Sequence, residues 1–140
     1  MHYFQSLLQI NWLPVLLGAL AHFAIGALWY SNILFAKKWL AYTKIDINDP
    51  NAKKGMAIMF SSSILMALLT SFGIAVLANK MQTTGIFNGV HLGLLVGICF
   101  GVTALSNSYL YEKRPLGLHL INGGYTVIGC VVAAIIICCW

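Results

Sequence analysis

The sequence predicts an all-α integral membrane protein, a bundle of four transmembrane helices that forms one domain over residues 1–140. Hydrophobic residues make up 60% of the chain and charged residues 8%, whereas roughly a quarter of a soluble domain is charged. Four apolar runs are each long enough to cross a bilayer core of about 30 Å as a helix, and none contains Lys, Arg, Asp or Glu. This composition excludes a nucleic-acid-binding domain, a disordered chain and a secreted module stapled by disulfides.

The four predicted spans are residues 11–36, 56–78, 89–111 and 116–139. A membrane β-barrel needs strands that alternate apolar and polar residues, and the continuous apolar run over 131–139 does not alternate. The first run is predicted to remain as a span, because residues 1–10 lack the Lys and Arg that begin a signal peptide.

The loops between the spans carry the charge, and they carry it unevenly. The first loop holds Lys37, Lys38, Lys44, Lys53 and Lys54, and the third holds Lys113 and Arg114. The second loop, on the opposite side, has Lys80. Because positively charged loops stay in the cytoplasm during insertion, the first and third loops are predicted to face inward, with both termini on the outer side. Asp49 and Pro50 are predicted to cap and begin the second helix.

Four glycines recur at every fourth residue of the third span, at Gly89, Gly93, Gly97 and Gly101. This spacing places them on one face of a helix, where another helix can approach to backbone distance. Their partner is expected to be another helix of this chain. The alternative is a second copy of the chain in a homo-oligomer.

Polar side chains gather at one depth, roughly 6–13 Å from the predicted inner boundary at a rise of 1.5 Å per residue. The candidate ligand-binding residues of this layer are Trp29, Tyr30, Asn107, Asn122 and Tyr125. Either they bond one another and hold the helices together, or they line a pocket for a small polar ligand or a lipid head group.

The sequence offers no candidate catalytic residue, metal site or cofactor site. No carboxylate lies within a span to carry acid–base chemistry, and no cysteine has metal-ligand spacing with a histidine. His22 and His91 differ by about 10 Å in height, which is too far for the two axial ligands of one haem. The simpler expectation for His22 is a neutral imidazole bonded to a backbone carbonyl, in room left by Gly18 and Gly26.

Motifs in both halves of the chain resemble one known family. The first half carries Asn11-Trp12-Leu13, Gly26-Ala27-Leu28-Trp29-Tyr30-Ser31, Leu34-Phe35 and Lys38-Trp39. The second half carries Tyr109-Leu110-Tyr111-Glu112, Arg114-Pro115 and Leu120-Ile121-Asn122-Gly123-Gly124-Tyr125. Over essentially the whole chain they resemble the small membrane proteins known as domain of unknown function 1761. The sequence departs from the family's pattern at Asn32, usually proline, and at Thr126, often histidine, and His22 lies outside the pattern.

The resemblance implies an architecture and no activity: a four-helix, multi-pass protein of the bacterial cytoplasmic (inner) membrane. It also implies that Trp29, Tyr30, Asn122 and Tyr125 are motif positions. We therefore expect a non-enzymatic protein, without a cofactor, whose inner polar layer binds a small amphiphile, a lipid or a partner membrane subunit. One alternative is a subunit of an oligomeric small-solute transporter or channel. A further alternative, resting on His22, is a haem or quinone redox subunit.

Overall fold

The computed structural model describes residues 9–140, apart from the side chain of Lys53. In chain order its helices are α2 (Trp12–Trp29), α3 (Ala36–Thr43), α4 (Ala52–Met81), α5 (Ile86–Leu94), η1 (Leu95–Val102), α6 (Thr103–Tyr111) and α7 (Leu116–Cys138). Four helical stretches are long and apolar enough to cross a membrane: Trp12–Trp29, Lys54–Met81, Ile86–Tyr111 and Leu116–Cys138. The predicted all-α fold with four membrane-spanning helices is confirmed.

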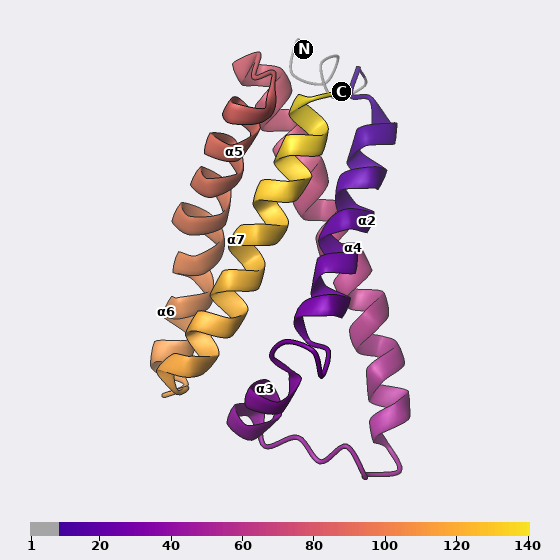
Figure 1. The fold of residues 1–140 in the computed structure, drawn as a ribbon, viewed down its shortest axis with the longest axis vertical. Helices are drawn as coiled ribbons and strands as arrows, with labels where there is room; N and C mark the ends of the chain where they lie inside the picture. Colours follow the sequence, from indigo (N-terminus) through magenta and orange to yellow (C-terminus); the bar gives the residue numbers. More distant parts are fainter. Residues whose placement is uncertain (1–8) are drawn as a thin grey trace.

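The start of α2 and the end of α7 lie at one end of the bundle, the terminal end, and α3 lies at the other, the α3 end (Figure 1). Between these ends α7 runs through the middle and contacts α2, α4, α5 and η1. Small residues form much of the core near the terminal end, including Ala78, Ala133 and Ala134 around Ile74. Helices with small contact residues approach closely, which is how membrane helices associate when lipid removes the hydrophobic drive.

The glycines of the third span all lie against α7. A Cβ built on Gly89 would come within 2.9 Å of the Cα of Ile135, and one on Gly97 within 2.9 Å of the Cα of Val127. A Cβ on Gly93 would overlap the backbone of Val131, and one on Gly101 would meet the side chain of Thr126. The backbones of the two helices are therefore in direct contact along this stripe.

The first helix is shorter than the predicted span, because a tight turn follows it. α2 ends at Trp29, and the hydroxyl of Ser31 donates to the carbonyl of Leu28 and accepts from the amide of Ile33. Serine side chains that bond nearby backbone groups compete with helix continuation. The chain then enters α3, which docks where the ring of Tyr42 lies on Gly117 of α7.

The start of the second helix also differs from the prediction. α4 begins at Ala52 and not at Pro50, and Asn51 precedes it without a side-chain cap. The carboxylate of Asp49 instead accepts from the amide of Asn51 at 2.8 Å, which closes a local turn ahead of the helix.

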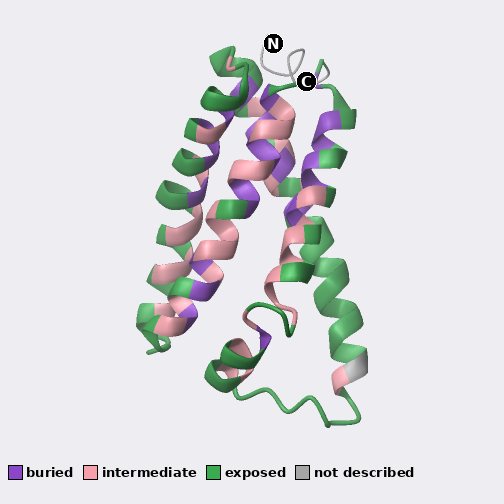
Figure 2. Cartoon of the chain, viewed as in Figure 1, coloured by how far each residue is buried: buried purple, intermediate pink, exposed green. Residues whose placement is uncertain are grey.

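Toward the α3 end, α4 separates from the rest of the bundle. Residues 54–66 are all exposed in a single chain, and Ala67 is the first buried residue of the helix (Figure 2). A helix packed on a neighbour buries one face, so this part of α4 is only loosely packed, and its described ring contact is that of Phe60 with Phe23 of α2.

The middle of the third span is a π-helix, η1, for which the sequence carries no predictive pattern. Each backbone bond in a π-helix reaches back five residues, so the carbonyl groups at its ends are displaced from α-helical partners. The hydroxyl of Thr103, just after η1, donates to the carbonyl of Cys99 at 2.6 Å. Side-chain hydroxyls of this kind satisfy backbone groups inside a membrane.

Candidate functional site

The polar layer predicted from helix depth contains a hydrogen-bonded chain of three side chains. The hydroxyl of Tyr30 donates to Oδ1 of Asn122 at 2.7 Å, and Nδ2 of Asn122 donates to the hydroxyl of Tyr109 at 2.7 Å. These bonds join the end of α2, α7 and α6. Nearby, Nε1 of Trp29 donates to the carbonyl of Ile121 at 2.9 Å. The side chains of Tyr30, Asn122 and Tyr109 are therefore bonded to one another, and that of Trp29 to the backbone of α7.

Glycines of α7 and α2 make room for the aromatic rings of the layer. The indole of Trp29 lies over Gly124, and the ring of Tyr125 lies over Gly26. Tyr125 meets Tyr30 edge-on, with ring centroids 5.4 Å apart. Four of the five candidate residues, Trp29, Tyr30, Asn122 and Tyr125, are thus brought together.

Asn107 is not part of this group. It is exposed on α6, and Tyr109 supplies the third span's contribution instead. Asn107 and Tyr109 are two positions apart in the helix, so their side chains point about 200° apart and only one of them can face α7. Depth alone cannot separate them. The signal that distinguishes Tyr109 was its place in the motif Tyr109-Leu110-Tyr111-Glu112.

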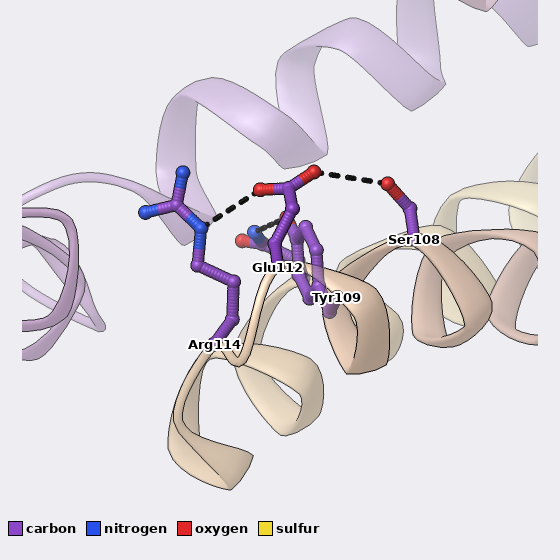
Figure 3. Close-up of polar contacts among 5 residues, drawn as sticks. Ser108, Tyr109, Glu112 and Arg114 are labelled. Atoms are coloured by element: carbon purple, nitrogen blue, oxygen red, sulfur yellow. Dashed lines mark hydrogen bonds and ion pairs between the residues drawn. The ribbon is translucent and has the colours of Figure 1, made fainter.

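A polar cluster lies just beyond the layer, in the turn between α6 and α7. The carboxylate of Glu112 accepts from Nε of Arg114 at 2.9 Å and from the hydroxyl of Ser108 at 3.0 Å (Figure 3). The hydrogen bond from Arg114, followed by that from Ser108, lowers the pKa of the Glu112 carboxyl below its usual value. All three side chains are exposed, and their bonds lie at the turn that connects the helices carrying Tyr109 and Asn122.

A cavity of about 980 Å³ lies between α4, η1 and α7. Most of its lining is apolar, with Met66, Phe72, Ile74, Val96 and Phe100 among the larger side chains. The polar side chains on its wall are His22, Ser62, Ser63, Thr70, Tyr125 and Thr126. None of the lining residues is Lys, Arg, Asp or Glu, so the cavity is uncharged when His22 is neutral.

Two features of the fold produce this cavity. From Ala67 toward the α3 end, α4 diverges from the bundle. Gly73 of α4, which lines the cavity, has no side chain to fill it, and a Cβ built on Gly73 would have no atom within 4 Å. On the opposite wall, η1 places Phe100 and Gly101 on the cavity. Tyr125 lines the cavity and also contacts Tyr30, so the cavity and the polar layer share a wall.

His22 is buried at the wall of the cavity with an unsatisfied nitrogen. Its side chain is 6% exposed, and Nδ1 has no hydrogen-bond partner. The ring lies against Gly129, where a Cβ would overlap it, and meets Tyr125 edge-on at 5.2 Å. The expectation of a bond to a backbone carbonyl beside Gly18 and Gly26 is therefore wrong. Gly18 instead faces Ser71 and Ala133, and the room for the imidazole is provided by α7.

Among residues 9–140, no group of three or more His, Cys, Asp or Glu is arranged to hold a metal ion. The four cysteines, Cys99, Cys130, Cys138 and Cys139, are free thiols. Cys130 is buried and lines the cavity. What the described site provides is an apolar volume with hydroxyl groups and one imidazole on its wall.

Comparison with known proteins gives a family. The model of the family described as "Protein of unknown function (DUF1761)" matches residues 13–138, nearly the whole chain. No curated protein and no solved structure gives a match. The match covers all four spans, the polar layer and the cavity. The chain belongs to the DUF1761 family.

Proposed function

We propose that this protein is a non-enzymatic membrane protein that binds a small amphiphile in the cavity between α4, η1 and α7. The observation that carries the proposal is the cavity itself. At about 980 Å³ it falls at the upper end of the 300–1,000 Å³ typical of small-molecule sites, and its largely apolar wall with a few polar groups is the usual lining of such sites.

The polar layer supports this cavity and is not its main binding surface. The Tyr30–Asn122–Tyr109 bonds leave few free polar groups there, and they hold α2, α6 and α7 at fixed spacing. Tyr125 links the polar layer to the cavity wall, because it packs on Tyr30 and also lines the cavity. In this proposal the apolar part of the ligand lies along Phe72, Ile74 and Phe100, and the ligand enters from the bilayer.

The setting is proposed as a bacterial cytoplasmic membrane with the α3 end in the cytoplasm. Lys37, Lys38, Lys113 and Arg114 lie at that end, and positive charge is retained inside during insertion. Single cysteines replacing Lys38 and Gln82, in a chain freed of its own cysteines, test the orientation. In intact cells an impermeant maleimide should label the residue at Gln82 and spare that at Lys38. The opposite labelling pattern would reverse the topology.

The binding proposal is tested by native mass spectrometry of the protein taken from its own membranes into lipid discs. We expect a defined extra mass on the wild-type chain. Gly73→Phe should remove it, since the new ring projects from an unobstructed Cβ into the cavity. Gly55→Phe is the matched control: it adds the same ring at another exposed glycine of α4 whose Cβ also meets nothing, but outside the cavity.

The proposal is overturned if the wild-type chain carries no defined mass and also fails to bind added 1-undecanol saturably. It is equally overturned if Gly73→Phe and Gly55→Phe retain the ligand to the same extent.

A second candidate is a homo-oligomeric transporter or channel subunit, favoured by the exposed stretch 54–66 of α4. Its three successive serines, Ser61, Ser62 and Ser63, are all exposed in a single chain. Ser61 bonds the carbonyl of Ala57, and a second copy packed on this stretch would bring further hydrogen-bonding groups to Ser62 and Ser63. Disulfide cross-linking of Met59→Cys between copies, in the cysteine-free chain, tests it against Leu69→Cys as control. Equal, weak cross-linking of both variants would exclude this interface.

A further inference from the structure

We infer that His22 selects the ligand by a hydrogen bond to an uncharged polar head group. The inference rests on the proposed function and deepens it, because it assigns the chemical class of the ligand and the residue that recognises it. Nδ1 of His22 is, in the part of the chain described, the buried side-chain polar atom that lacks a partner. Buried polar groups in native proteins are almost always paired, so an unpaired one on a cavity wall points to a missing partner.

The ring is fixed at the wall of the cavity, where His22 is one of the lining residues and is 6% exposed. Gly129 lies under it and Tyr125 meets it edge-on, so α7 contacts two sides of the imidazole. The wall to which His22 belongs also includes Thr126 and Cys130 of α7 and Thr70 of α4. The neutral ring exists as two tautomers, so Nδ1 can carry the proton and donate to a ligand, or present its lone pair and accept from one.

The charge of the surroundings determines the class of head group. No Lys, Arg, Asp or Glu lines the cavity, and a charge taken from water into an apolar site without a counterion is strongly disfavoured. The same reasoning keeps the imidazole neutral, with one N–H donor and one bare acceptor nitrogen. A carboxylate, phosphate or ammonium head has no partner here. A ketone or quinone carbonyl can accept from the N–H, and an alcohol can donate to the bare nitrogen.

The cavity also fits the body of such a molecule. Phe72 and Phe100 line it along with His22 and Tyr125, so much of its wall is aromatic and apolar. An alkyl or isoprenoid chain is satisfied by apolar contact alone. The head group is then the only part of the ligand that requires a specific partner, and His22 is the residue placed to provide it.

The test uses four probes with the same chain length and different heads: undecane, 2-undecanone, 1-undecanol and undecanoate. Each is titrated into wild-type protein in lipid discs, with binding measured by native mass spectrometry. We expect 2-undecanone or 1-undecanol to bind about tenfold more tightly than undecane, the effect of one hydrogen bond to a buried group. Undecanoate should bind no more tightly than undecane. A preference for the ketone would show that the ring donates, and a preference for the alcohol that it accepts.

Variants of His22 locate the effect. His22→Phe keeps a ring over Gly129 but removes both nitrogens, so the preference for the polar probes should disappear while undecane still binds. His22→Gln restores a donor and an acceptor and should recover part of the preference. The same contact can be measured by NMR in the wild-type protein labelled with ¹⁵N-histidine. Addition of 2-undecanone or 1-undecanol should shift the signals of the His22 ring nitrogens, and addition of undecane should not.

The outcomes separate the two proposals. If none of the four probes binds saturably, the proposed function fails. If all bind equally and the His22 nitrogen signals do not move, the cavity binds apolar molecules and the role of His22 is wrong. If undecanoate binds most tightly, the inference of an uncharged head is overturned.

Discussion

The hydroxyl of Tyr30 donates a 2.7 Å hydrogen bond to Oδ1 of Asn122, a residue 92 positions later in the chain. Tyr30 is the first residue beyond α2, and Asn122 lies in the second turn of α7, so the bond ties the end of one span to the start of another. The amide of Asn122 continues to the hydroxyl of Tyr109. One asparagine therefore holds three spans together near the α3 end, where α4 contributes little packing.

Asn122→Ala is expected to destabilise the protein by about 1–3 kcal/mol, because it leaves the Tyr30 and Tyr109 hydroxyls without their partner. Tyr30→Phe removes one bond and should cost less, about 0.6 kcal/mol and at most about 1.7 kcal/mol, the average and the maximum for single hydrogen bonds between membrane helices. Reversible unfolding in mixed micelles measures both. Asn107→Ala is the control, since Asn107 is exposed on the neighbouring helix and outside the network. A loss of stability from Asn107→Ala as large as that from Asn122→Ala would contradict this assignment.

Gly93→Ala and Gly73→Ala should act in opposite directions. A Cβ on Gly93 overlaps the backbone of Val131, so α5 and α7 must separate, at a cost of about 1–3 kcal/mol. A Cβ on Gly73 meets nothing within 4 Å, and alanine favours the helix over glycine by up to about 1 kcal/mol. Thermal unfolding of the two variants in the same detergent gives the comparison. Equal shifts in Tm would mean that the third span does not touch α7 through its glycine face.

Gly129→Ala is expected to displace the imidazole of His22, since the added methyl group would occupy the position of the ring. The variant should lose stability and also lose the preference for polar probes. In a His22→Ala background the ring is gone, so the same change at Gly129 should cost little. The double-mutant cycle measures this coupling, which for residues in contact is about 0.5–3 kcal/mol. Additive effects would show that His22 does not lie on Gly129.

Glu112 gives the fold a weak dependence on acid pH. The hydrogen bonds from Arg114 and Ser108 lower the pKa of its carboxyl, so the folded state favours the ionised form. Any stability gained from this is fully present above the unfolded-state pKa, and it is lost as the pH falls through the lower folded-state value. NMR titration should place the midpoint of Glu112 below 4.5. In Glu112→Gln, the part of the stability loss at acid pH that comes from Glu112 should be absent. A titration midpoint of Glu112 at or above 4.5 would refute the ion pair.

The membrane fold was predictable because the bilayer leaves few choices. Uncharged apolar runs of this length must be spanning helices, and no detail of packing alters that. Helix ends were less predictable. The turn at Ser31, which ends α2, depends on hydrogen bonds of a single hydroxyl, and the residues that follow are as apolar as those of the helix.

The sequence predicted the depth of the candidate site in the membrane, but not which face of each helix its residues occupy. Counting residues from the membrane boundary grouped Trp29, Tyr30, Asn122 and Tyr125, which do meet, but it also selected Asn107, whose side chain lies away from α7. The cavity had no sequence signal. It depends on the angle at which α4 leaves α7 and on the π-helical turns that place Phe100, and both arise from contacts between helices.

The π-helical segment gives the third span a tolerance to changes in chain length. The backbone hydrogen bond of a π-helix spans five residues, one more than that of an α-helix. The segment η1 therefore contains an extra residue between α5 and α6. Deleting one residue within Leu95–Val102 would shorten a π turn to an α turn and leave the flanking helices in their original phase. The same deletion in α7 has no surplus to draw on and would rotate every later residue by about 100°. The third span can therefore change its length by one residue while Gly89 and Tyr109 keep the directions in which they point.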